Sequence, residues 1–526
     1  MSEPSSPVSP LLDAIDSHDT LAEYRHCTQL ALQGDRNLAA DRLVQLLSSV
    51  KANSFQARIH NDLAVIASMD GRLADAQQEF DRAVKLAPDW LVPQENRRRL
   101  LQGMESVPIP AAASRQTRVA IVSLLFNWPS TGGGTVHTAE TGKFLTQAGY
   151  QVRHFFAEYA EWGLGNVTEP PLSPSEAIRF TPDCWNVPEI QSRFRKALQA
   201  FQPDWVIVTD SWNSKPILAE AARDFPYFLR IAAQECLCPL NNVRLLFDQN
   251  KFHSCPKHQL ATPAECCQCV HHNGRFSGGL HQAERELVNY GTPEYDRTLR
   301  SAFANAEAVL VVNPLIGAMI SPYARHIQVV PSGFDPARFP SQHTANPRDA
   351  GTPLRILFAG LVNEPMKGFE VIAAACDRLW NVRQDFELLA TADPPGPVNP
   401  FTRYVGWHSQ TALPTLMHES DILVFPTVAE EALGRTAVEA MGASRPVVAS
   451  RIGGLQFTVV DGATGLLFEP GNVEDLCRKL QRLLDDSDLR DRLGRAGRER
   501  FEEHYTWDSI LAKHYVPLLG ASSRKL

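Results

Sequence analysis

The sequence lacks an uninterrupted apolar run of the roughly 18 to 20 residues that a membrane-spanning helix needs. Its apolar stretches are strand-length pieces such as Val206–Val208 and Val309–Val312. The first residues, MSEPSSPVSPLLDAIDSHD, do not combine a basic start with an apolar stretch, so they do not resemble a secretory signal. We therefore expect a cytoplasmic protein without a transmembrane segment, and peripheral association with a membrane stays open.

Cysteine is scarce, and positive charge is not in excess. Ten cysteines in 526 residues are too few for a disulfide scaffold and suit a reducing compartment. With 51 basic against 59 acidic residues the net charge is -8, so no overall positive field attracts nucleic acid. The length predicts about three folded domains.

The N-terminal part is predicted to be helical after a tail. Residues 1–17 are rich in Ser and Pro and predict a flexible tail. Residues 18–104 have apolar positions every three or four residues, the period of amphipathic helices. Within them, Ala57–Trp90 has the 34-residue length of a tetratricopeptide repeat, and small Ala64 and Ala76 would let two antiparallel helices approach closely.

Other parts of this helical module fit the repeat less well. Leu21–Val50 resembles a degenerate earlier copy, and Leu91–Gln102 a closing helix. Gly71 would allow the turn between the helices of the repeat, and Pro88 would end its second helix. Two repeats are fewer than such arrays need to stand alone, so a brace for the neighbouring domain and a groove for a protein partner are both open.

After a Pro/Ala linker at residues 105–117, strand-like and helix-like segments alternate, as in parallel α/β domains. Residues 118–340 and 341–505 are predicted to form two such domains. The predicted strands are 118–126, 152–156, 205–209, 308–312, 354–360, 386–390, 421–425 and 446–449. Helices are predicted after the glycine loop 131–135 as far as Gln147, at 368–379 and at 435–441. Open α/β sheets bind ligands beyond the carboxyl ends of their strands, so a site is expected between the two domains.

The segment FPTVAEEALGRTAVEAMGASRPVVASRIGG, residues 425–454, carries the most chemistry. Glu431 precedes Glu439 by eight positions, and a predicted helix starts near Gly434 between them. The free N–H groups at such a helix start favour an anion such as a diphosphate. Two carboxylates beside an anion site suit a charged ligand that bears hydroxyls.

These segments resemble retaining glycosyltransferases of the GT-B fold, family 4, over about residues 118–515. Glu431 and Glu439 match the ExxxxxxxE signature of the family. The other matching pieces, in order, are Gly132–Gly133, VVPSGFDPARF at 329–339, Met366–Gly368, Gly406–His408, IGGLQFTVVDGATGLLF at 452–468 and Phe501–Tyr515.

The resemblance implies an α/β protein with two Rossmann-like domains facing across a cleft, preceded by the all-α tetratricopeptide-like module. The C-terminal helix at 506–526 would pack back on the first Rossmann-like domain. The implied reaction is hexosyl transfer from a nucleotide-diphosphate sugar to an acceptor, with retention at the anomeric carbon and no cofactor required for catalysis.

The resemblance also implies roles for individual residues. Glu431 would bind hydroxyls of the donor sugar, and Glu439 the ribose of the nucleotide. Lys367 would neutralise the diphosphate. Asp210 would face the acceptor. The remaining donor-binding groups would be the backbone N–H groups of Leu433, Gly434 and Arg435, with Gly132 and Gly133 from the early loop.

Each of these residues also has a simpler interpretation. Glu430 and Glu431 can be a solvated acidic pair at a helix start, and Lys367 an ordinary exposed lysine. Asp210 can cap a helix that begins near Lys215. The glycines 132–134 can merely provide a tight turn.

The chain departs from the family pattern at three places. Leu361 stands where many members have an arginine that helps to bind phosphate, Phe457 where many have a glutamate, and Ser332 where asparagine is usual. Arg435 is the hypothesised source of the missing charge.

Six of the ten cysteines fall within a cysteine-rich insertion at residues 236–272. Cys255 and His258 form CxxH, and Cys266 and Cys269 form CxxC, which predicts a structural zinc site. Cys236, Cys238, Cys267 and His271 are rival ligands. Free thiols in an irregular insertion are the alternative.

Two other functions stay open besides the transferase. One is a scaffold on a transferase fold that has lost turnover, which Leu361 and Phe457 favour. The other is nucleotide-sugar epimerisation. The acceptor can be a glycan, a lipid-linked sugar, a metabolite or a protein, and the helical module suggests a protein partner. Nucleic acid is not an expected partner.

Overall fold

The computed structural model describes residues 36–88 except 71, residues 116–339 except 131, 241–243, 249–250 and 275–276, and residues 351–520 except 395–398, together with single helical residues within 23–30 and 93–100. The predicted tail and Gly71 lie outside the described residues, as do nearly all of the linker and most of the predicted closing helix. The chain divides into two compact units, Met1–Ser114 and Arg115–Leu526. In the described ranges, no helix combines the length and the hydropathy that crossing a bilayer requires.

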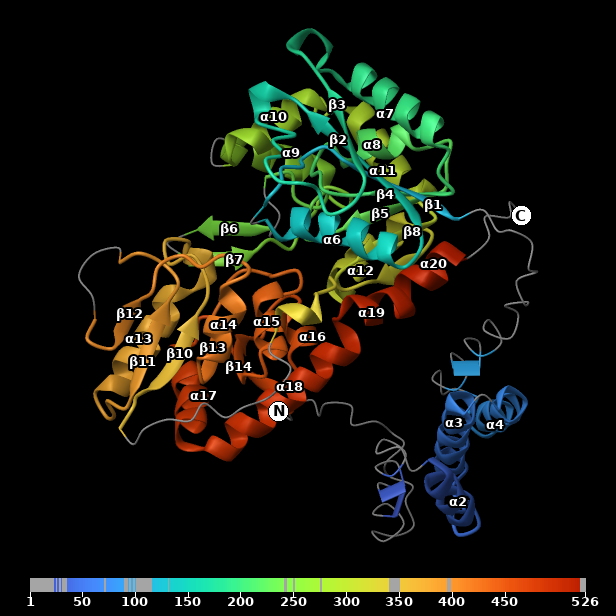
Figure 1. The fold of residues 1–526 in the computed structure, drawn as a ribbon, viewed down its shortest axis with the longest axis vertical. Helices are drawn as coiled ribbons and strands as arrows, with labels where there is room; N and C mark the ends of the chain where they lie inside the picture. Colours follow the sequence, from blue (N-terminus) through green and yellow to red (C-terminus); the bar gives the residue numbers. More distant parts are fainter. Residues whose placement is uncertain are drawn as a thin grey trace, which may run out of the picture. The chain divides into compact units, whose positions relative to one another are not determined.

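The first unit contains helices α2 (Arg36–Leu47), α3 (Asn53–Met69) and α4 (Leu73–Leu86) (Figure 1). Ala64 of α3 and Ala76 of α4 are fully buried, and they share an apolar cluster with Phe80. Small side chains at these positions let the two helices pack closely. The unit is helical in its described residues, and its assignment as a tetratricopeptide array stays a prediction.

The N-terminal lobe of the second unit is built on a seven-stranded parallel sheet, in the order β3-β2-β1-β4-β5-β8-β9. Its strands are β1 (Arg118–Ser123), β2 (Gln151–Glu158), β3 (Ser175–Arg179), β4 (Trp205–Val208), β5 (Tyr227–Ile231), β8 (Ala308–Val311) and β9 (Ile327–Val329). The apolar run WVIV of β4 is wholly buried, as expected for a parallel strand covered on both faces. The chain order reverses between β1 and β4, which opens a crevice beyond their carboxyl ends.

The C-terminal lobe repeats this plan with six parallel strands in the order β12-β11-β10-β13-β14-β15. Its strands are β10 (Leu354–Phe358), β11 (Phe386–Ala390), β12 (Thr402–Tyr404), β13 (Ile422–Phe425), β14 (Val447–Ser450) and β15 (Gly465–Phe468). Here the order reverses between β10 and β13. The loops that follow these two strands therefore face the second crevice.

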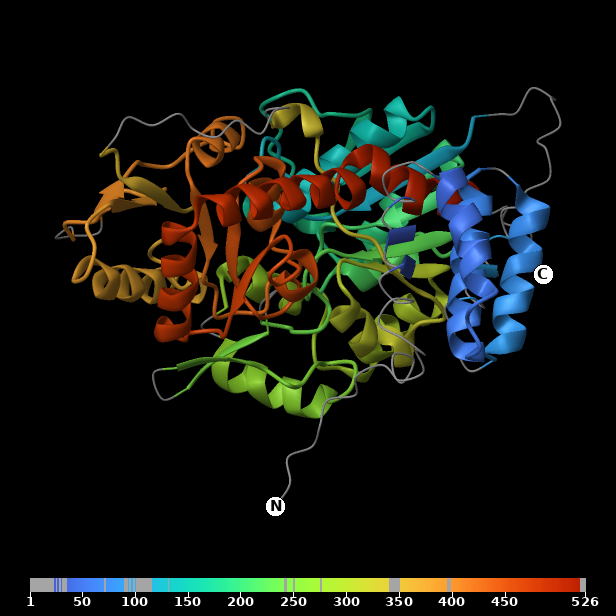
Figure 2. The ribbon, with the colours of Figure 1, turned by 90° about the horizontal axis from the view of Figure 1, so that it is seen from below.

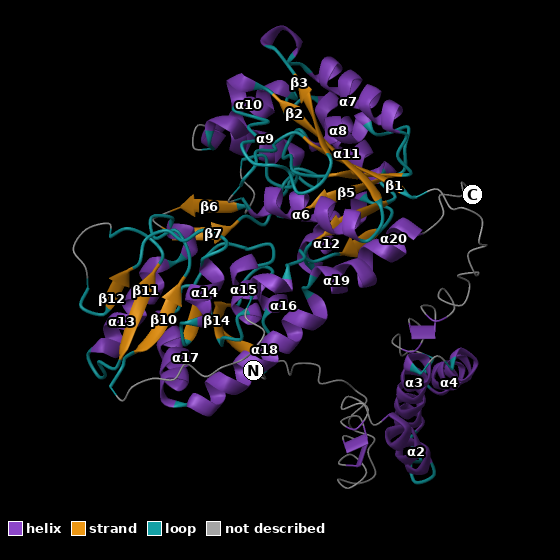
Figure 3. Cartoon of the chain, in the orientation of Figure 1, coloured by secondary structure: helices purple, strands orange, loops and turns teal. Residues whose placement is uncertain are grey.

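Helices cover the faces of both sheets (Figure 3). Those of the N-terminal lobe are α6 (Gly133–Gln147), α7 (Val187–Phe201), α8 (Lys215–Ala221), α9 (Pro263–Asn273), α10 (Gly279–Leu287), α11 (Pro293–Asn305) and α12 (Pro314–Ile320). Those of the C-terminal lobe are α13 (Phe369–Trp380), α14 (Leu413–His418), α15 (Arg435–Gly442), α16 (Leu455–Thr458), α17 (Val473–Asp485) and α18 (Ser487–His504). The predicted helices ending at Gln147 and starting near Gly434 are confirmed.

The cysteine-rich insertion contains an antiparallel hairpin, β6 (Leu245–Asp248) and β7 (Lys251–Ser254), as well as α9. The hairpin extends beside the C-terminal lobe (Figures 1 and 2). It therefore lies where the insertion can contact both lobes.

The last helices return from the C-terminal lobe to the N-terminal lobe, as Figure 2 shows for the segment drawn in red. They are α19 (Trp507–Ile510) and α20 (Val516–Gly520). Trp507 is fully buried and stacks on Phe144 of α6, with ring centroids 5.1 Å apart. The indole Nε1 of Trp205 donates to the carbonyl of Leu519 at 3.1 Å. These contacts join the end of the chain to the first sheet.

Candidate functional site

A cavity of about 510 Å3 lies between the two lobes, at the carboxyl ends of both sheets. The N-terminal lobe contributes Gly133, Gly134, Ala232 and Ala233. The C-terminal lobe contributes the larger share, including Lys367, Glu431, Leu433, Gly434, Arg435 and Glu439. Seven of the sequence-predicted site residues therefore line one cavity, because the two crevices face each other.

The first turn of α15 forms one wall of the cavity. Gly434 is its N-cap, with φ 75° and no side-chain cap for the first N–H groups. A Cβ at Gly434 would lie 2.3 Å from Leu455, so glycine is required both for the backbone angle and for the space. The backbone N–H groups of a helix start that has no side-chain cap favour an anion in this part of the cavity.

The loop before α15 is held by the glycine pair at 453–454. The N–H of Gly454 donates to the carbonyl of Glu431 at 2.6 Å. A Cβ at Gly454 would lie 2.0 Å from the carbonyl oxygen of Ala432, so only glycine allows this close contact. The backbone at Glu431 is thus fixed before any ligand arrives.

Glu431 and Lys367 form an ion pair, with Oε1 and Nζ 2.6 Å apart. Both side chains are about one-third exposed, so neither the solvated acidic pair nor the ordinary exposed lysine describes them. Burial alone lowers the pKa of the Lys367 ammonium, but the Glu431 carboxylate more than offsets this and raises that pKa above its ordinary value. The cavity therefore holds the ammonium of Lys367 beside the carboxyl group of Glu431.

The position of Lys367 depends on a left-handed backbone turn at the next residue, Gly368. Lys367 ends a short 3-10 helix, and Gly368 has φ 76°. A Cβ at Gly368 would lie 1.9 Å from the carbonyl oxygen of Pro426, which follows β13. The loops after β10 and β13 therefore touch at Gly368, and this contact brings Lys367 to Glu431.

Glu439 is buried on α15 and is paired with Arg338, whose Nη2 lies 3.3 Å from Oε1. The same nitrogen donates to the carbonyl of Gln410 at 2.8 Å. Arg338 was not predicted as a site residue, although it lies in the matching segment at 329–339. A buried carboxylate needs a partner, and that requirement was the available signal.

Arg435 crosses from α15 to the N-terminal lobe. Its Cδ lies 2.9 Å from the place where a Cβ on Gly133 would be, so the glycine leaves room for the arginine. Its guanidinium lies over the ring of Phe334, 4.3 Å from the centroid, and 3.8 Å from the Glu140 carboxylate. Burial raises the pKa of Glu140, against the opposing effect of Arg435.

Gly132 and Asp210 are not among the residues that line the cavity. Gly132 is the N-cap of α6, so it shapes the turn, and Gly133 and Gly134 face the space instead. Asp210 follows β4 with φ 37°, and its Oδ1 lies 3.6 Å from a Cβ placed on Gly134. It stands behind the glycine loop.

Asp210 has an unusual electrostatic environment. Burial raises its pKa to about 7, although a hydrogen bond from Thr135 and the charge of Lys215 oppose this shift. Its Oδ2 is buried without a hydrogen-bond partner among the described residues. The predicted alternative, a cap of α8, is wrong because Ser214 is the N-cap of that helix.

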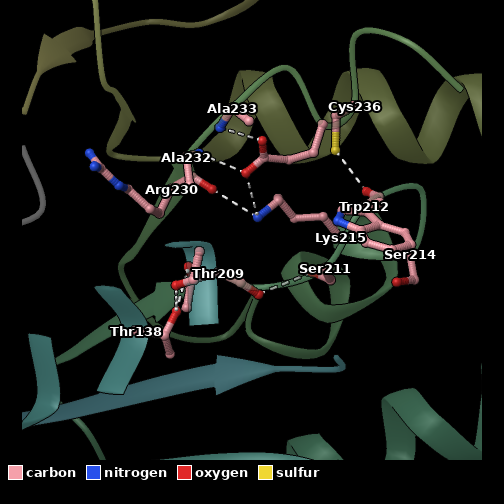
Figure 4. A network of polar contacts seen from close by, with 12 residues as sticks. Thr138, Thr209, Ser211, Trp212, Ser214, Lys215, Arg230, Ala232, Ala233 and Cys236 are labelled. Atoms are coloured by element: carbon pink, nitrogen blue, oxygen red, sulfur yellow. Dashed lines mark hydrogen bonds and ion pairs between the residues drawn. The ribbon is translucent and has the colours of Figure 1, made fainter. Parts of the chain in front are cut away.

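A buried polar network supports the cavity wall at residues 232–233 (Figure 4). Lys215 is fully buried, donates to the carbonyl of Arg230 at 2.8 Å and lies 3.6 Å from the Glu235 carboxylate. Glu235 accepts from the N–H groups of Ala232 and Ala233, at 2.7 and 2.6 Å. This network was not predicted from the sequence, because nothing in the segment 215–235 indicates that Lys215 and Glu235 are buried beside each other.

The departures from the family pattern differ in their surroundings. Leu361 lines the cavity and is 47% exposed, so no cation replaces it at that position. Ser332 is buried and also lines the cavity, whereas Phe457 does not. Arg435 is the second cation among the residues that line the space.

The predicted zinc ligands Cys255, His258, Cys266 and Cys269 are not assembled. Among the described residues, no three His, Cys, Asp or Glu side chains are grouped so that they could hold a metal ion. His258 is buried and lies edge-on to Tyr323, with ring centroids 6.1 Å apart. Its ring packs as an interior group.

Comparisons with known proteins agree with this geometry. Residues 398–500 match the model of the family described as Glycosyl transferases group 1. Glycogen synthase of Mycobacterium tuberculosis is 28% identical over 250 residues, which are 45% of this chain and 58% of that protein. The chain thus spans less than two-thirds of the length of this curated relative.

Solved structures share the two-lobed fold. Sucrose-phosphate synthase from Thermosynechococcus elongatus matches over 77% of this chain and 100% of that one, with TM-score 0.54 and 18% identity. Anabaena HepE in complex with UDP-glucose matches over 77% and 100%, with TM-score 0.51 and 16% identity. The fold with two parallel sheets and the match over residues 398–500 together support a group 1 glycosyltransferase of the GT-B fold.

Proposed function

We propose that the protein transfers a hexosyl group from a nucleoside-diphosphate sugar to an acceptor, with retention of the anomeric configuration, as in family 4. The observation that carries this proposal is the convergence of Lys367, Glu431 and the first turn of α15 on one cavity. A cation and free backbone N–H groups suit a diphosphate, and the neighbouring carboxylate suits sugar hydroxyls.

In this proposal the donor replaces contacts that the cavity residues make with one another. Lys367 turns its charge to the diphosphate, and Glu431 accepts hydrogen bonds from hydroxyls of the sugar. The N–H groups of Leu433, Gly434 and Arg435 hold the phosphate oxygens. Glu439 binds the ribose, and Arg338 orients its carboxylate.

The reaction breaks the bond between the anomeric carbon and the phosphate oxygen, and it forms a bond from that carbon to the acceptor oxygen on the same face. The acceptor proton passes to the departing diphosphate oxygen, so no protein nucleophile is needed. Lys367 and the first turn of α15 stabilise the negative charge that grows on the leaving group. Positioning supplies much of the remaining acceleration.

We assign the acceptor side to the N-terminal lobe. Asp210, behind the glycine loop, would orient an acceptor hydroxyl that approaches over Gly134. The acceptor is a glycan, a lipid-linked sugar, a metabolite or a protein, and the helical unit would recruit a protein partner. No specific observation favours the scaffold or the epimerase over the transferase.

The direct test is turnover with UDP-glucose, the donor in the HepE complex, in the presence of simple sugar acceptors. Release of UDP and formation of an α-linked product, assigned by NMR, are the expected results. A thermal-shift panel of other nucleoside-diphosphate sugars identifies the base and sugar if UDP-glucose does not bind, because a ligand of the folded state raises the melting temperature. No release, no transfer and no shift with any donor would contradict the proposal.

A further inference from the structure

Glu430, the neighbour of Glu431, is held from the opposite lobe. Gln234 Nε2 and Arg244 Nη2 both donate to Glu430 Oε2, each at 2.9 Å. Arg244 Nε also donates to Gln234 Oε1. The three side chains thus form a closed ring of hydrogen bonds across the boundary between the lobes, which we call the Glu430 ring.

The Glu430 ring is largely removed from water. The Gln234 residue is 2% exposed, and the side chains of Arg244 and Glu430 are 6% and 22% exposed. Charge-assisted hydrogen bonds in such surroundings are short and strong, and a remaining partner is left uncompensated when one is removed. The ring is therefore more than a solvated surface ion pair.

Arg244 is itself fixed within the cysteine-rich insertion. Its φ is 46°, a left-handed value that a side-chain-bearing residue keeps only when its surroundings demand it. Its carbonyl accepts from the N–H of Cys255 at 2.6 Å, and its Nη1 donates to the carbonyl of Lys257 at 3.5 Å. Hydrogen bonds within the insertion thus hold Arg244 where its guanidinium faces the C-terminal lobe.

The loop that carries Glu430 also carries Glu431. Asn313, from the N-terminal lobe, donates to the carbonyl of Ala432 at 2.6 Å, and Gly454 holds the carbonyl of Glu431 from within the C-terminal lobe. The C-terminal lobe also holds this loop, because the N–H of Val428 donates to the carbonyl of Met366 at 2.9 Å and Lys367 donates to Glu431 at 2.6 Å. The opposite lobe holds the two neighbours of Glu431 in the sequence, through the Glu430 ring and through Asn313. Separation of the lobes would release the loop from both.

We propose that Arg244 and Gln234 are positioning residues. By donating hydrogen bonds to Glu430 across the cleft, they set the orientation of the neighbouring Glu431 toward the donor sugar. The inference rests on the proposed function for its catalytic consequence. Its structural part, the hydrogen bonding of the Glu430 side chain and the Ala432 carbonyl by the opposite lobe, stands independently. The cysteine-rich insertion thereby acquires a role in donor-sugar placement that needs no metal.

The test compares Arg244→Met and Glu430→Gln with the unchanged chain. Arg383→Met is the matched control, because Arg383 is 18% exposed and pairs with Asp385 and Asp485 within the C-terminal lobe, and it is not among the residues lining the cavity. Hydrogen–deuterium exchange of the peptide 426–434 is measured without ligand. The kcat and KM for UDP-glucose and the Kd of UDP are measured on the same proteins.

We expect faster exchange of the 426–434 amides in Arg244→Met and Glu430→Gln, and a fall in kcat of about 10- to 100-fold, because displacement of a positioning group by about 1 Å has that effect. The Kd of UDP should change little, since the nucleotide contacts lie on α15 and at Lys367. Arg244→Lys should recover part of the kcat, and Arg383→Met should alter neither measurement.

The outcomes separate the two proposals. Unchanged exchange of the 426–434 peptide in both variants would overturn the positioning inference, whatever the activity. Faster exchange with kcat intact, or an equal loss of UDP affinity and kcat, would also overturn it. Faster exchange in a protein that shows no turnover in its unchanged form would contradict the proposed function but support the structural grip on Glu430.

Discussion

The strongest single test of the donor site is Lys367→Met, which removes the charge and keeps much of the apolar stem. The Nζ of Lys367 lies 2.6 Å from Glu431 Oε1, and the two side chains are 34% and 27% exposed. Two unit charges at that distance interact by about 6 kcal/mol at an effective dielectric constant of about 20. Screening of side chains exposed to this extent leaves about 2 to 3 kcal/mol for a charge-assisted contact with a bound diphosphate.

That free energy corresponds to a loss in kcat/KM of about 30- to 150-fold, since about 1.4 kcal/mol is a tenfold change in rate. Most of the loss should fall on kcat, because the negative charge on the diphosphate grows as the glycosidic bond breaks. The assay is continuous detection of UDP released from UDP-glucose. Lys367→Arg should retain part of the activity, because it keeps the charge but changes the geometry.

Lys143→Met is the matched control. Lys143 pairs with Asp335 at 3.0 Å, its side chain is 31% exposed, and it is not among the residues lining the cavity. Its loss should change kcat/KM by about twofold or less, as for an ordinary partly exposed ion pair. Equal losses in the two variants, or kcat/KM of Lys367→Met within about twofold of the unchanged enzyme, would refute the assignment of Lys367 to the diphosphate.

Three further predictions concern Arg435 in the cavity wall and two residues near it, Asp210 and Gly368. Arg435→Ala should raise the KM for the donor about tenfold and leave the KM for the acceptor unchanged. Adding Glu140→Gln to this variant should restore the melting temperature but not the donor KM. An unaltered donor KM in Arg435→Ala would refute a role of Arg435 in binding phosphate. Folding raises the pKa of Asp210 from 3.8 to about 7. The folded protein therefore favours the protonated carboxyl, and the stabilisation from this proton is full below about pH 4 and is lost as the pH rises through about 7. Calorimetry should therefore show Asp210→Asn gaining stability relative to the unchanged protein from pH 4.5 to 8, and a constant difference would be the contrary result. Gly368→Ala should lower the melting temperature and kcat/KM much more than Gly462→Ala, since both have φ near 75° but only the Cβ at Gly368 meets a backbone oxygen, at 1.9 Å; equal effects would show that the clash is relieved.

We propose that Arg435 compensates for the missing cation at Leu361. The family pattern places a cation there, and in this protein Lys367 and Arg435 are the cations lining the cavity. Arg435 reaches the N-terminal lobe through the space above Gly133. The position of Arg435 in the C-terminal lobe therefore depends on the absence of a side chain at Gly133 in the N-terminal lobe.

Part of the fold was predictable because it depends on local sequence. The apolar runs at β4, β8 and β11 indicated buried parallel strands, and helices were predicted to begin at Gly368 and near Gly434. The eight strands and three helices predicted within residues 118–505 lie within a few residues of the observed elements. Of the two parallel sheets, strands β3, β5, β9, β12 and β15 were missed. Segments of three to five residues without clear boundaries do not distinguish a strand from other structure.

The site was predictable where its members share one motif. Glu431, Gly434, Arg435 and Glu439 lie within nine residues, so their approach to one space is a local property of a loop and a helix. Arg338 and the Glu430 ring were not predictable in the same way. Arg338 and Glu439, like Arg244 and Glu430, lie about 100 or more residues apart in the sequence. Neither segment carries a pattern that indicates contact with the other.

The sequence by itself determined the alternation of strands and helices, the glycine turns and the spacing of the two carboxylates, because each is set by the conformational limits of a few neighbouring residues. Only the tertiary structure decided which charges face each other: that Lys367 meets Glu431, that Arg244 grips Glu430 and that Asp210 stands behind the glycine loop. Electrostatic pairing depends on distance in space and on exclusion of water, and both arise only when the two sheets and the insertion pack together.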